Sequence, residues 1–305
     1  MIDRILVPLD GSRVAEQILP HLRRLLHRQD AEVILVRAAV PPPMENGMLI
    51  ADVLLAAARD YLTQTQEHLR DQGVRVRSVA RVGAPAGVIL EIAEEERATM
   101  IALATHGETG LKRLLAGSIA EAVLRRSPVP VLLVRPFWSY ELLPGRTDGD
   151  ELRPMRNLLV PMDKPEDAAL LLPPVTELAR LFDARVVLLH VMAQAGHRVA
   201  HPAAERSEEE AQLARLASQL EHDKVEAVTL IENGEPAHQI LEAARANDID
   251  LIAMSTHARG GFLGLFSSSV TEKVLRESTC PMLVVHAPVP GTGRREQDPA
   301  GVTGR

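Results

Sequence analysis

The chain contains two copies of one pattern, and this internal duplication limits its possible folds more than any other feature. When the sequence is shifted by 151 positions, residues 99–134 align with 250–285, and 15 of the 36 aligned pairs are identical, against about two expected by chance. Upstream, the Val-Pro-Leu-Asp motif at 7–10 returns as Val-Pro-Met-Asp at 160–163. We therefore expect a tandem duplication of a domain of roughly 140 residues, each copy large enough to bury its own core.

Short apolar runs without polar alternation recur in each half, which is typical of parallel strands covered on both faces. Strands are predicted near residues 3–9, 32–38, 74–81, 99–104 and 130–134, and again near 156–162, 185–191, 224–230, 250–255 and 281–286. Amphipathic helical segments lie between them, including residues 12–28, 49–72 and 85–97. This alternation predicts an α/β fold with two tandem doubly wound domains, Rossmann-like or flavodoxin-like, each with a five-stranded parallel sheet.

The domain boundaries follow from composition. Residues 139–154 are rich in proline, glycine and charge, which indicates a linker. We assign the first domain to residues 1–138 and the second domain to 155–288. The tail at 289–305 is rich in glycine and charge and almost lacks apolar residues, so we expect it to be disordered.

Composition excludes several classes of function. A net charge of -7 with scattered basic residues and 2% aromatic content gives no support to a nucleic-acid-binding surface. The single Cys280 excludes an internal disulfide and fits a reducing compartment. Apolar runs end well short of the roughly 18 residues that a membrane-spanning helix needs. The chain enters a predicted strand directly after Met1, which leaves no room for a signal peptide. We therefore expect a cytoplasmic protein without a membrane partner.

A motif near the end of the first copy has the spacing of a phosphate-binding loop. Ala-Thr-His-Gly at 104–107 follows a predicted strand, and after nine residues Gly-Ser at 117–118 begins a predicted helix. The free N–H groups and positive dipole end of a helix start favour an anion, and glycine lets the backbone approach it closely. Asp10 follows another strand, and ligands of open α/β sheets bind outside such carboxyl ends.

Taken together, these motifs resemble the universal stress protein family, whose ATP-binding members carry Gly-x2-Gly-x9-Gly followed by Ser or Thr. The resemblance covers nearly all of both halves. It includes Pro-x-Asp at 8–10, Gly-x-Pro at 83–85, Thr-His-Gly at 105–107 and the final strand of the first copy at 127–134. It implies an ATP-binding regulatory protein of the universal stress response, with ATP bound alone or with Mg²⁺.

The resemblance also implies which residues contact the nucleotide. On the base and ribose side these are Pro8, Asp10, Ala38 and Leu103. On the phosphate side they are Ala104, His106, Gly107, Gly117, Ser118 and Ile119. The first glycine of the family pattern is Ala104 here, a departure of one methyl group. We therefore expect the first half to bind a nucleotide, less tightly than an intact pattern would.

The second copy departs further, because all three glycine positions are filled. Its pattern is Ser-Thr-His-Ala at 255–258 and Ser-Ser at 268–269. The added side chains are expected to obstruct phosphate, so we predict that only the first half binds nucleotide well. The alternative is that the serine hydroxyl groups bind phosphate themselves.

Several of these residues also have simpler interpretations. Ser118 and Glu121 match a capping box, which would stabilise a helix start without a ligand. Asp10 fits equally well as a cap of the first helix or as an acceptor for ribose hydroxyls or a metal-bound water. His106 is retained as His257 in the altered copy, which favours a role in the turn over catalysis.

Catalytic machinery is not evident, since the chain has neither a Gly-x4-Gly-Lys-Ser/Thr loop nor a nucleophile placed beside an orienting base. We therefore expect a regulator with at most weak ATPase activity. The alternatives are a nucleotide-independent interaction scaffold and a slow ATP-hydrolysing enzyme that uses a metal and Asp10. The apolar strand at 131–134 is expected to pair with 283–285, which would give an intrachain pseudo-dimer able to form a homodimer.

Overall fold

A computed structural model describes residues 1–26, 31–42, 47–104, 117–134, 155–163, 165–192, 203–256 and 270–286. The first half contains β1 (Arg4–Pro8), α1 (Arg13–Glu16), α2 (Ile18–Leu26), β2 (Glu32–Ala39), α3 (Gly47–Asp71), β3 (Val76–Val82), α4 (Pro85–Glu95), β4 (Met100–Ala104), α5 (Gly117–Arg126) and β5 (Val131–Val134). The second contains β6 (Asn157–Met162), α6 (Pro165–Phe182), β7 (Arg185–Met192), α7 (Ala203–His222), β8 (Ala227–Asn233), α8 (Pro236–Ala246), β9 (Leu251–Thr256), α9 (Val270–Glu277) and β10 (Met282–His286). The predicted linker at 139–154 and the tail at 289–305 lie outside the described residues.

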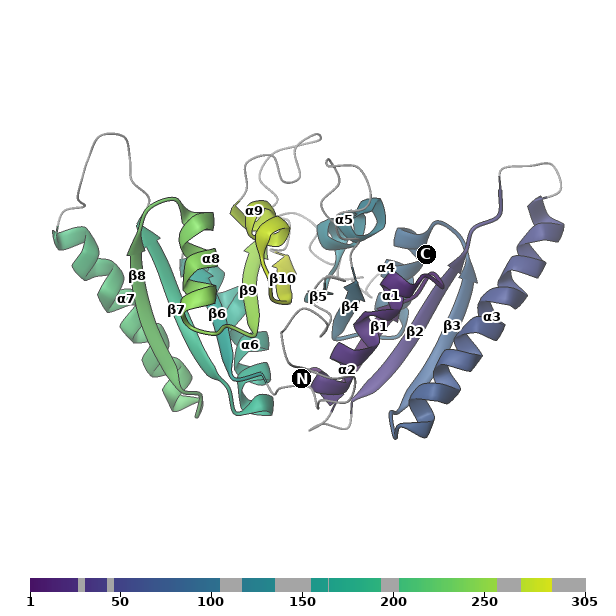
Figure 1. The fold of residues 1–305 in the computed structure, drawn as a ribbon, viewed down its shortest axis with the longest axis horizontal. Helices are drawn as coiled ribbons and strands as arrows, with labels where there is room; N and C mark the ends of the chain where they lie inside the picture. The colour runs from purple at the N-terminus through teal and green to yellow at the C-terminus, as the bar shows by residue number, and fades with distance from the viewer. Residues whose placement is uncertain are drawn as a thin grey trace, which may run out of the picture.

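The described strands form one sheet in the order β3-β2-β1-β4-β5-β10-β9-β6-β7-β8. Within each half the strands are parallel. The predicted α/β fold with two tandem doubly wound halves is therefore confirmed, and the order 3-2-1-4-5 is that of a Rossmann half rather than a flavodoxin. Figure 1 shows the two halves side by side, with the outer strands β3 and β8 at opposite ends of the molecule.

The helix predicted over residues 12–28 is in fact two helices, divided at Gln17. Pro20 explains the division. It has no N–H to donate to the carbonyl group of Glu16, so the hydrogen-bond ladder cannot run through this point. Pro20 is tolerated where it stands because it lies in the first turn of α2, where backbone N–H groups have no partner within the helix.

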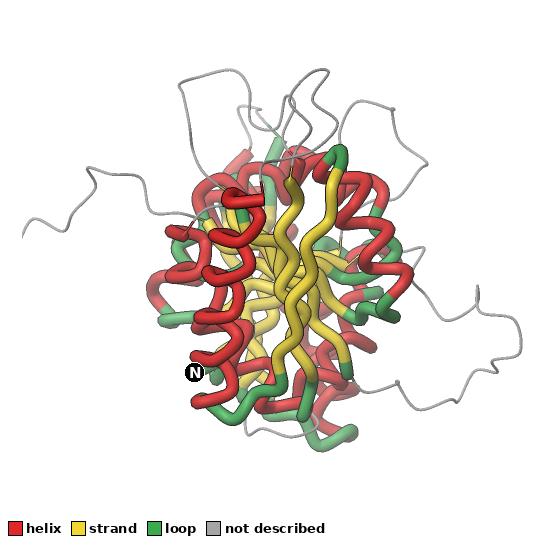
Figure 2. Tube along the Cα trace, turned by 90° about the vertical axis from the view of Figure 1, so that its left-hand side faces the viewer, coloured by secondary structure: helices red, strands yellow, loops and turns green. Residues whose placement is uncertain are grey.

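Helices cover both faces of the sheet, as the end view in Figure 2 shows. Side chains of α2, α3, α6 and α7 pack in one apolar cluster, and those of α4, α5, α8 and α9 pack in the other. Strand residues alternate between the two, so Ile5 and Val7 face the first cluster while Leu6 faces the second. This double burial explains why the strands are apolar throughout instead of alternating with polar residues.

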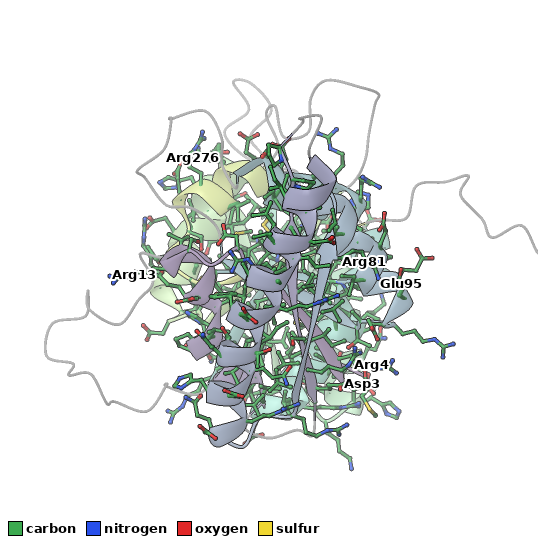
Figure 3. The ribbon with its side chains drawn as sticks, turned by 90° about the vertical axis from the view of Figure 1, so that its right-hand side faces the viewer. Asp3, Arg4, Arg13, Arg81, Glu95 and Arg276 are labelled. Carbon is green, nitrogen blue, oxygen red and sulfur yellow. The ribbon has the colours of Figure 1, made fainter. Side chains whose placement is uncertain are left out.

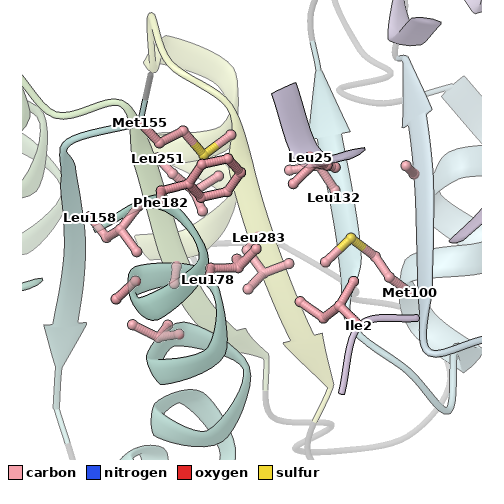
Figure 4. Packing of buried hydrophobic residues seen from close by; sticks show 14 of the residues in the cluster. Ile2, Leu25, Met100, Leu132, Met155, Leu158, Leu178, Phe182, Leu251 and Leu283 are labelled. Carbon is pink, nitrogen blue, oxygen red and sulfur yellow. The ribbon is translucent and has the colours of Figure 1, made fainter. Parts of the chain in front are cut away.

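The two halves are joined by β5 and β10, which pair antiparallel. Leu132 lies opposite Leu283, and the pairs Met282–Leu133 and Val284–Val131 flank it. Leu283 is the copy of Leu132 in the 151-residue repeat, so a pseudo-twofold axis passes between these two leucines. The predicted pairing of the closing strands is thus present, and both apolar clusters continue across the join. Figure 4 shows the cluster that contains Leu132 and Leu283, with residues from both halves.

Candidate functional site

The carboxyl ends of β1 and β4 lie side by side, because the two strands pair in parallel through Ile5–Met100 and Leu6–Ile101. The strand order reverses here, since β2 and β3 follow on one side of β1 while β4 and β5 lie on the other. The reversal brings the loop after β1, with Asp10, next to the end of β4, with Ala104. This is the point at which open α/β sheets bind ligands.

The loop after β1 is ordered by a short chain of hydrogen bonds. Ser12 donates its backbone N–H to Asp10 Oδ1 at 2.8 Å. Ser12 is itself the N-cap of α1, and its Oγ accepts from the N–H of Ala15 at 3.1 Å. The interpretation of Asp10 as the cap of the first helix is therefore wrong, because Ser12 is the N-cap of α1. Sequence reasoning overlooked Ser12, although serine three residues before a helical alanine is an ordinary capping signal.

Two of the residues predicted to line the base lie on the same face of the sheet. Leu103, at 5% exposure, belongs to the cluster beneath α4 and α5, and Ala38 packs against that cluster from β2. Pro8 ends β1 between them and is partly exposed. The three positions therefore come from the adjacent strands β2, β1 and β4 and form a small, apolar end of the sheet beside Asp10.

The predicted phosphate residues are only partly described. Helix α5 begins at Gly117, and Ser118 and Ile119 are exposed in its first turn. Ser118 is thus the second described residue of α5, and the residues before Gly117 lie outside the described part of the chain, so the capping-box interpretation stays a prediction. His106 and Gly107 lie outside the described residues, as do the second-half positions 257–258 and 268–269.

The second half differs from the first at the same place in the sheet. Ser255, which replaces Ala104 of the first copy, donates its hydroxyl group to Asp167 Oδ1 at 2.5 Å. Asp167 lies in the first turn of α6 and is only 4% exposed. In the repeat that aligns 7–10 with 160–163, its counterpart is the apolar Val14. The sequence gives no obvious signal for this contact, because the two residues are 88 positions apart.

A second arrangement that sequence reasoning missed lies at the end of β2. The Arg37 guanidinium group stands 4.5 Å from the centre of the Tyr61 ring. A Cβ added to Gly11 would lie 3.0 Å from both terminal nitrogens of Arg37, so the guanidinium rests against this glycine. Tyr61 donates its hydroxyl to Glu16 at 2.8 Å. Burial and the contact with Glu16 raise the pKa of Tyr61, which keeps its ring neutral.

Metal-binding and membrane-spanning features were also sought. The described residues contain no group of three or more His, Cys, Asp or Glu side chains placed to hold a metal ion. In the same residues, no helix has the length and apolar character required to cross a bilayer.

The geometry defines a tandem pair of Rossmann-type α/β units, each with a reversal of strand order of the kind at which open α/β sheets bind ligands. The model of the universal stress protein family matches residues 1–135 and 154–286. The chain therefore belongs to the universal stress protein family.

Individual relatives agree with this assignment. A universal stress protein of Mycolicibacterium smegmatis is 25% identical over 92% of this chain and 96% of its own length. One from Methanocaldococcus jannaschii is 33% identical over 43% of this chain and 81% of its own length. Among solved structures, a universal stress protein from Archaeoglobus fulgidus has a TM-score of 0.73 at 18% identity, over 93% of this chain and 98% of its own.

Proposed function

We propose that this protein is an ATP-binding regulatory member of the universal stress family, and that it binds the nucleotide mainly in its first half. Asp10, Ala38 and Leu103 lie at the ends of adjacent strands, where the strand order reverses, and β4, which contains Leu103, leads toward α5. This is the observation that carries the proposal. A small apolar end of the sheet suits a flat base, and the adjacent carboxylate suits the hydroxyl groups of a ribose.

Helix α5 supplies the element that a phosphate chain needs. Its first residue is Gly117, so the helix starts without a side chain at the position where a ligand would meet the free N–H groups. The exposed hydroxyl of Ser118 in the same turn adds a donor. These residues would hold the phosphates by backbone and hydroxyl donors. An ATP-bound Mg²⁺ would neutralise phosphate charge, and Asp10 would be the residue to accept hydrogen bonds from its waters.

The second half is less suited to phosphate because of Asp167. Its carboxyl oxygens and phosphate oxygens are both acceptors, and its burial keeps water from screening the two from each other. Ser255 already donates its hydroxyl to this carboxyl group. The hydroxyl is therefore not available to a phosphate in this arrangement, which weakens the alternative that the second-half serines replace the glycines as phosphate donors.

The experiment that tests the proposal is titration calorimetry with ATP on the full chain and on Gly117→Val. We expect one ATP per chain, and a loss of at least about tenfold in affinity in the variant. The matched control is Gly87→Val. It makes the same change in the first turn of α4, where an added Cβ meets only Glu91 Oε1 at 4.0 Å. Unchanged ATP affinity in Gly117→Val would overturn the phosphate assignment.

Two further experiments test which half binds ATP, and whether the protein is an ATP-binding regulator, a nucleotide-independent scaffold or a slow ATPase. Asp10→Ala should weaken ATP binding while the mirror variant Asp163→Ala should not, and two equivalent sites would contradict the preference for the first half. Small molecules released by heating the freshly purified protein should include ATP by mass. Their absence, with no measurable affinity, would favour a nucleotide-independent scaffold. Sustained turnover that disappears in Asp10→Ala would favour a slow ATPase.

A further inference from the structure

The Arg37 guanidinium group stands at the place where a Rossmann-type sheet meets the ribose of its ligand. Arg37 is the third residue from the end of β2, and β2 pairs with β1 up to Val36–Pro8. It is thus adjacent to the loop that carries Asp10 and Gly11. In dinucleotide-binding sheets of this strand order, an acidic residue near this position accepts from a ribose hydroxyl, whereas an arginine accommodates a phosphate on that hydroxyl.

Among the described residues, the contacts of the Arg37 guanidinium leave its hydrogen-bonding capacity unused. It rests against Gly11 and over the Tyr61 ring, which are packing contacts. Across the described ranges, no hydrogen bond or ion pair to a protein acceptor involves Arg37. An arginine has five N–H donors in a rigid fork that matches phosphate oxygens. Arg37 points to the face of the sheet that α3 covers, opposite the face of Ala38, and its half-buried fork reaches Gly11 just after the carboxyl end of β1. With no acceptor among the described residues, such a fork is suited to an anion.

The arrangement around Arg37 belongs to the first half alone. Its copy in the repeat is His190, whose Nδ1 lies 3.0 Å from the Met162 carbonyl oxygen and 3.6 Å from a Glu209 carboxylate oxygen. Nδ1 of His190 is therefore engaged within the protein. The counterpart of Gly11 is Lys164, so the glycine that gives the guanidinium its room is also missing from the second half.

Gly11 has a second property that links it to Arg37. Its φ of +84° lies in the left-handed region, which strongly favours glycine. The same glycine allows the guanidinium to approach the backbone, since any side chain would place an atom 3.0 Å from two of its nitrogens. The turn after β1 and the position of Arg37 are thus determined together.

We infer that the first-half crevice prefers an adenine nucleotide that carries a second phosphate on a ribose hydroxyl, and that Arg37 binds this phosphate. The inference rests on the proposed function, because it concerns the ribose of the same nucleotide. The candidate ligands share one chemical group, a phosphomonoester on the ribose. Its position on the 2′ or 3′ oxygen is decided by the experiment.

The test measures the dissociation constants of adenosine 5′-monophosphate, adenosine 2′,5′-bisphosphate and adenosine 3′,5′-bisphosphate by titration calorimetry on the full chain. At least one bisphosphate should bind about tenfold or more tightly than the monophosphate, because a charge-assisted bidentate contact is added. In Arg37→Met the ratio of the two affinities should fall to near one. Higher salt should also reduce the ratio in the unmodified protein, since the added contact is between charges.

The matched control is Arg81→Met. It removes the same charge from the neighbouring strand β3, where Arg81 is paired with Glu95 at 2.5 Å, and it should keep the ratio. Equal affinities for monophosphate and bisphosphates in the unmodified protein would overturn this inference and leave the proposed function standing. If ATP and all three nucleotides fail to bind, the proposed function fails as well. A ratio that persists in Arg37→Met would assign the second phosphate to another residue.

Discussion

The join between the halves should behave as a shared core and not as a contact between two independent domains. Leu132 and Leu283 lie opposite each other in the β5–β10 ladder, on the same face, and are 1% and 0% exposed. Replacing either leucine with alanine should lower the free energy of unfolding by about 3–5 kcal/mol, through lost burial and a cavity that its neighbours fill only partly. Because the two side chains line one space, the double variant should deviate from additivity by about 0.5–3 kcal/mol.

The control for this cycle is Leu62→Ala in α3. Leu62 is as buried as Leu132, at 1% exposure, and belongs to the same cluster. It packs with the outer strands of the first half, however, and β2 is four strand spacings of about 4.8 Å from β10. Leu62→Ala should therefore destabilise by a similar amount and should be additive with Leu283→Ala within about 0.5 kcal/mol.

The assay is urea unfolding followed by circular dichroism, with hydrogen exchange measured for the segments that contain β5 and β10. We expect a single transition in the unmodified chain, since both apolar clusters cross the join. Leu132→Ala should accelerate exchange in β10 as well as in β5. The reasoning is refuted if the two cycles show the same coupling, or if exchange in β10 does not change when Leu132 is shortened.

Two further predictions concern the second half. Ser255→Ala should destabilise the fold by about 1–3 kcal/mol, because it leaves the buried Asp167 carboxyl group without this donor. The control, Ser78→Ala in β3, should cost less than about 0.5 kcal/mol. Equal losses of stability in urea unfolding would contradict the role of the contact. Burial raises the pKa of Cys280 from 9.0 to about 11. Between these pH values the unfolded state loses the thiol proton while the folded state keeps it. The free energy of unfolding should therefore fall by about 2–3 kcal/mol as pH rises through this range. Cys280→Ala should remove that part of the pH dependence, and an unchanged profile in urea titrations at pH 8 and pH 11 would show that the thiol is not its source.

The candidate site shows which parts of a crevice local sequence can indicate. Asp10 and the Gly-Ser pair at 117–118 could be found because each follows a recognisable signal, the end of an apolar run or the start of an amphipathic one. The Ser12 cap was also readable in principle, but Asp10 is a stronger-looking candidate for the same role. Such errors of one or two residues at helix ends are expected, because several polar residues there can serve as the cap.

Contacts across the sheet could not be found in this way. Arg37 and Tyr61 are ordinary residues in their own segments, and nothing near either one indicates that they stack. Figure 3 shows a similar case on the surface, where Arg81 of β3 and Glu95 of α4 lie together. Each such pair depends on which helix covers which strands, and that choice follows from the packing of the whole face.

The sequence by itself determined that this protein is a duplication, that each copy alternates strands and helices, and that the closing strands are apolar enough to pair. These properties depend on side-chain periodicity within short segments, which is the part of folding that a linear pattern encodes directly. Only the tertiary structure decided that Leu132 meets Leu283 on a pseudo-twofold axis, that Asp167 accepts from Ser255 in the second half and that Arg37 rests against Gly11 in the first. The physical reason is that burial selects these contacts among residues far apart in the chain, where no local signal records the partner.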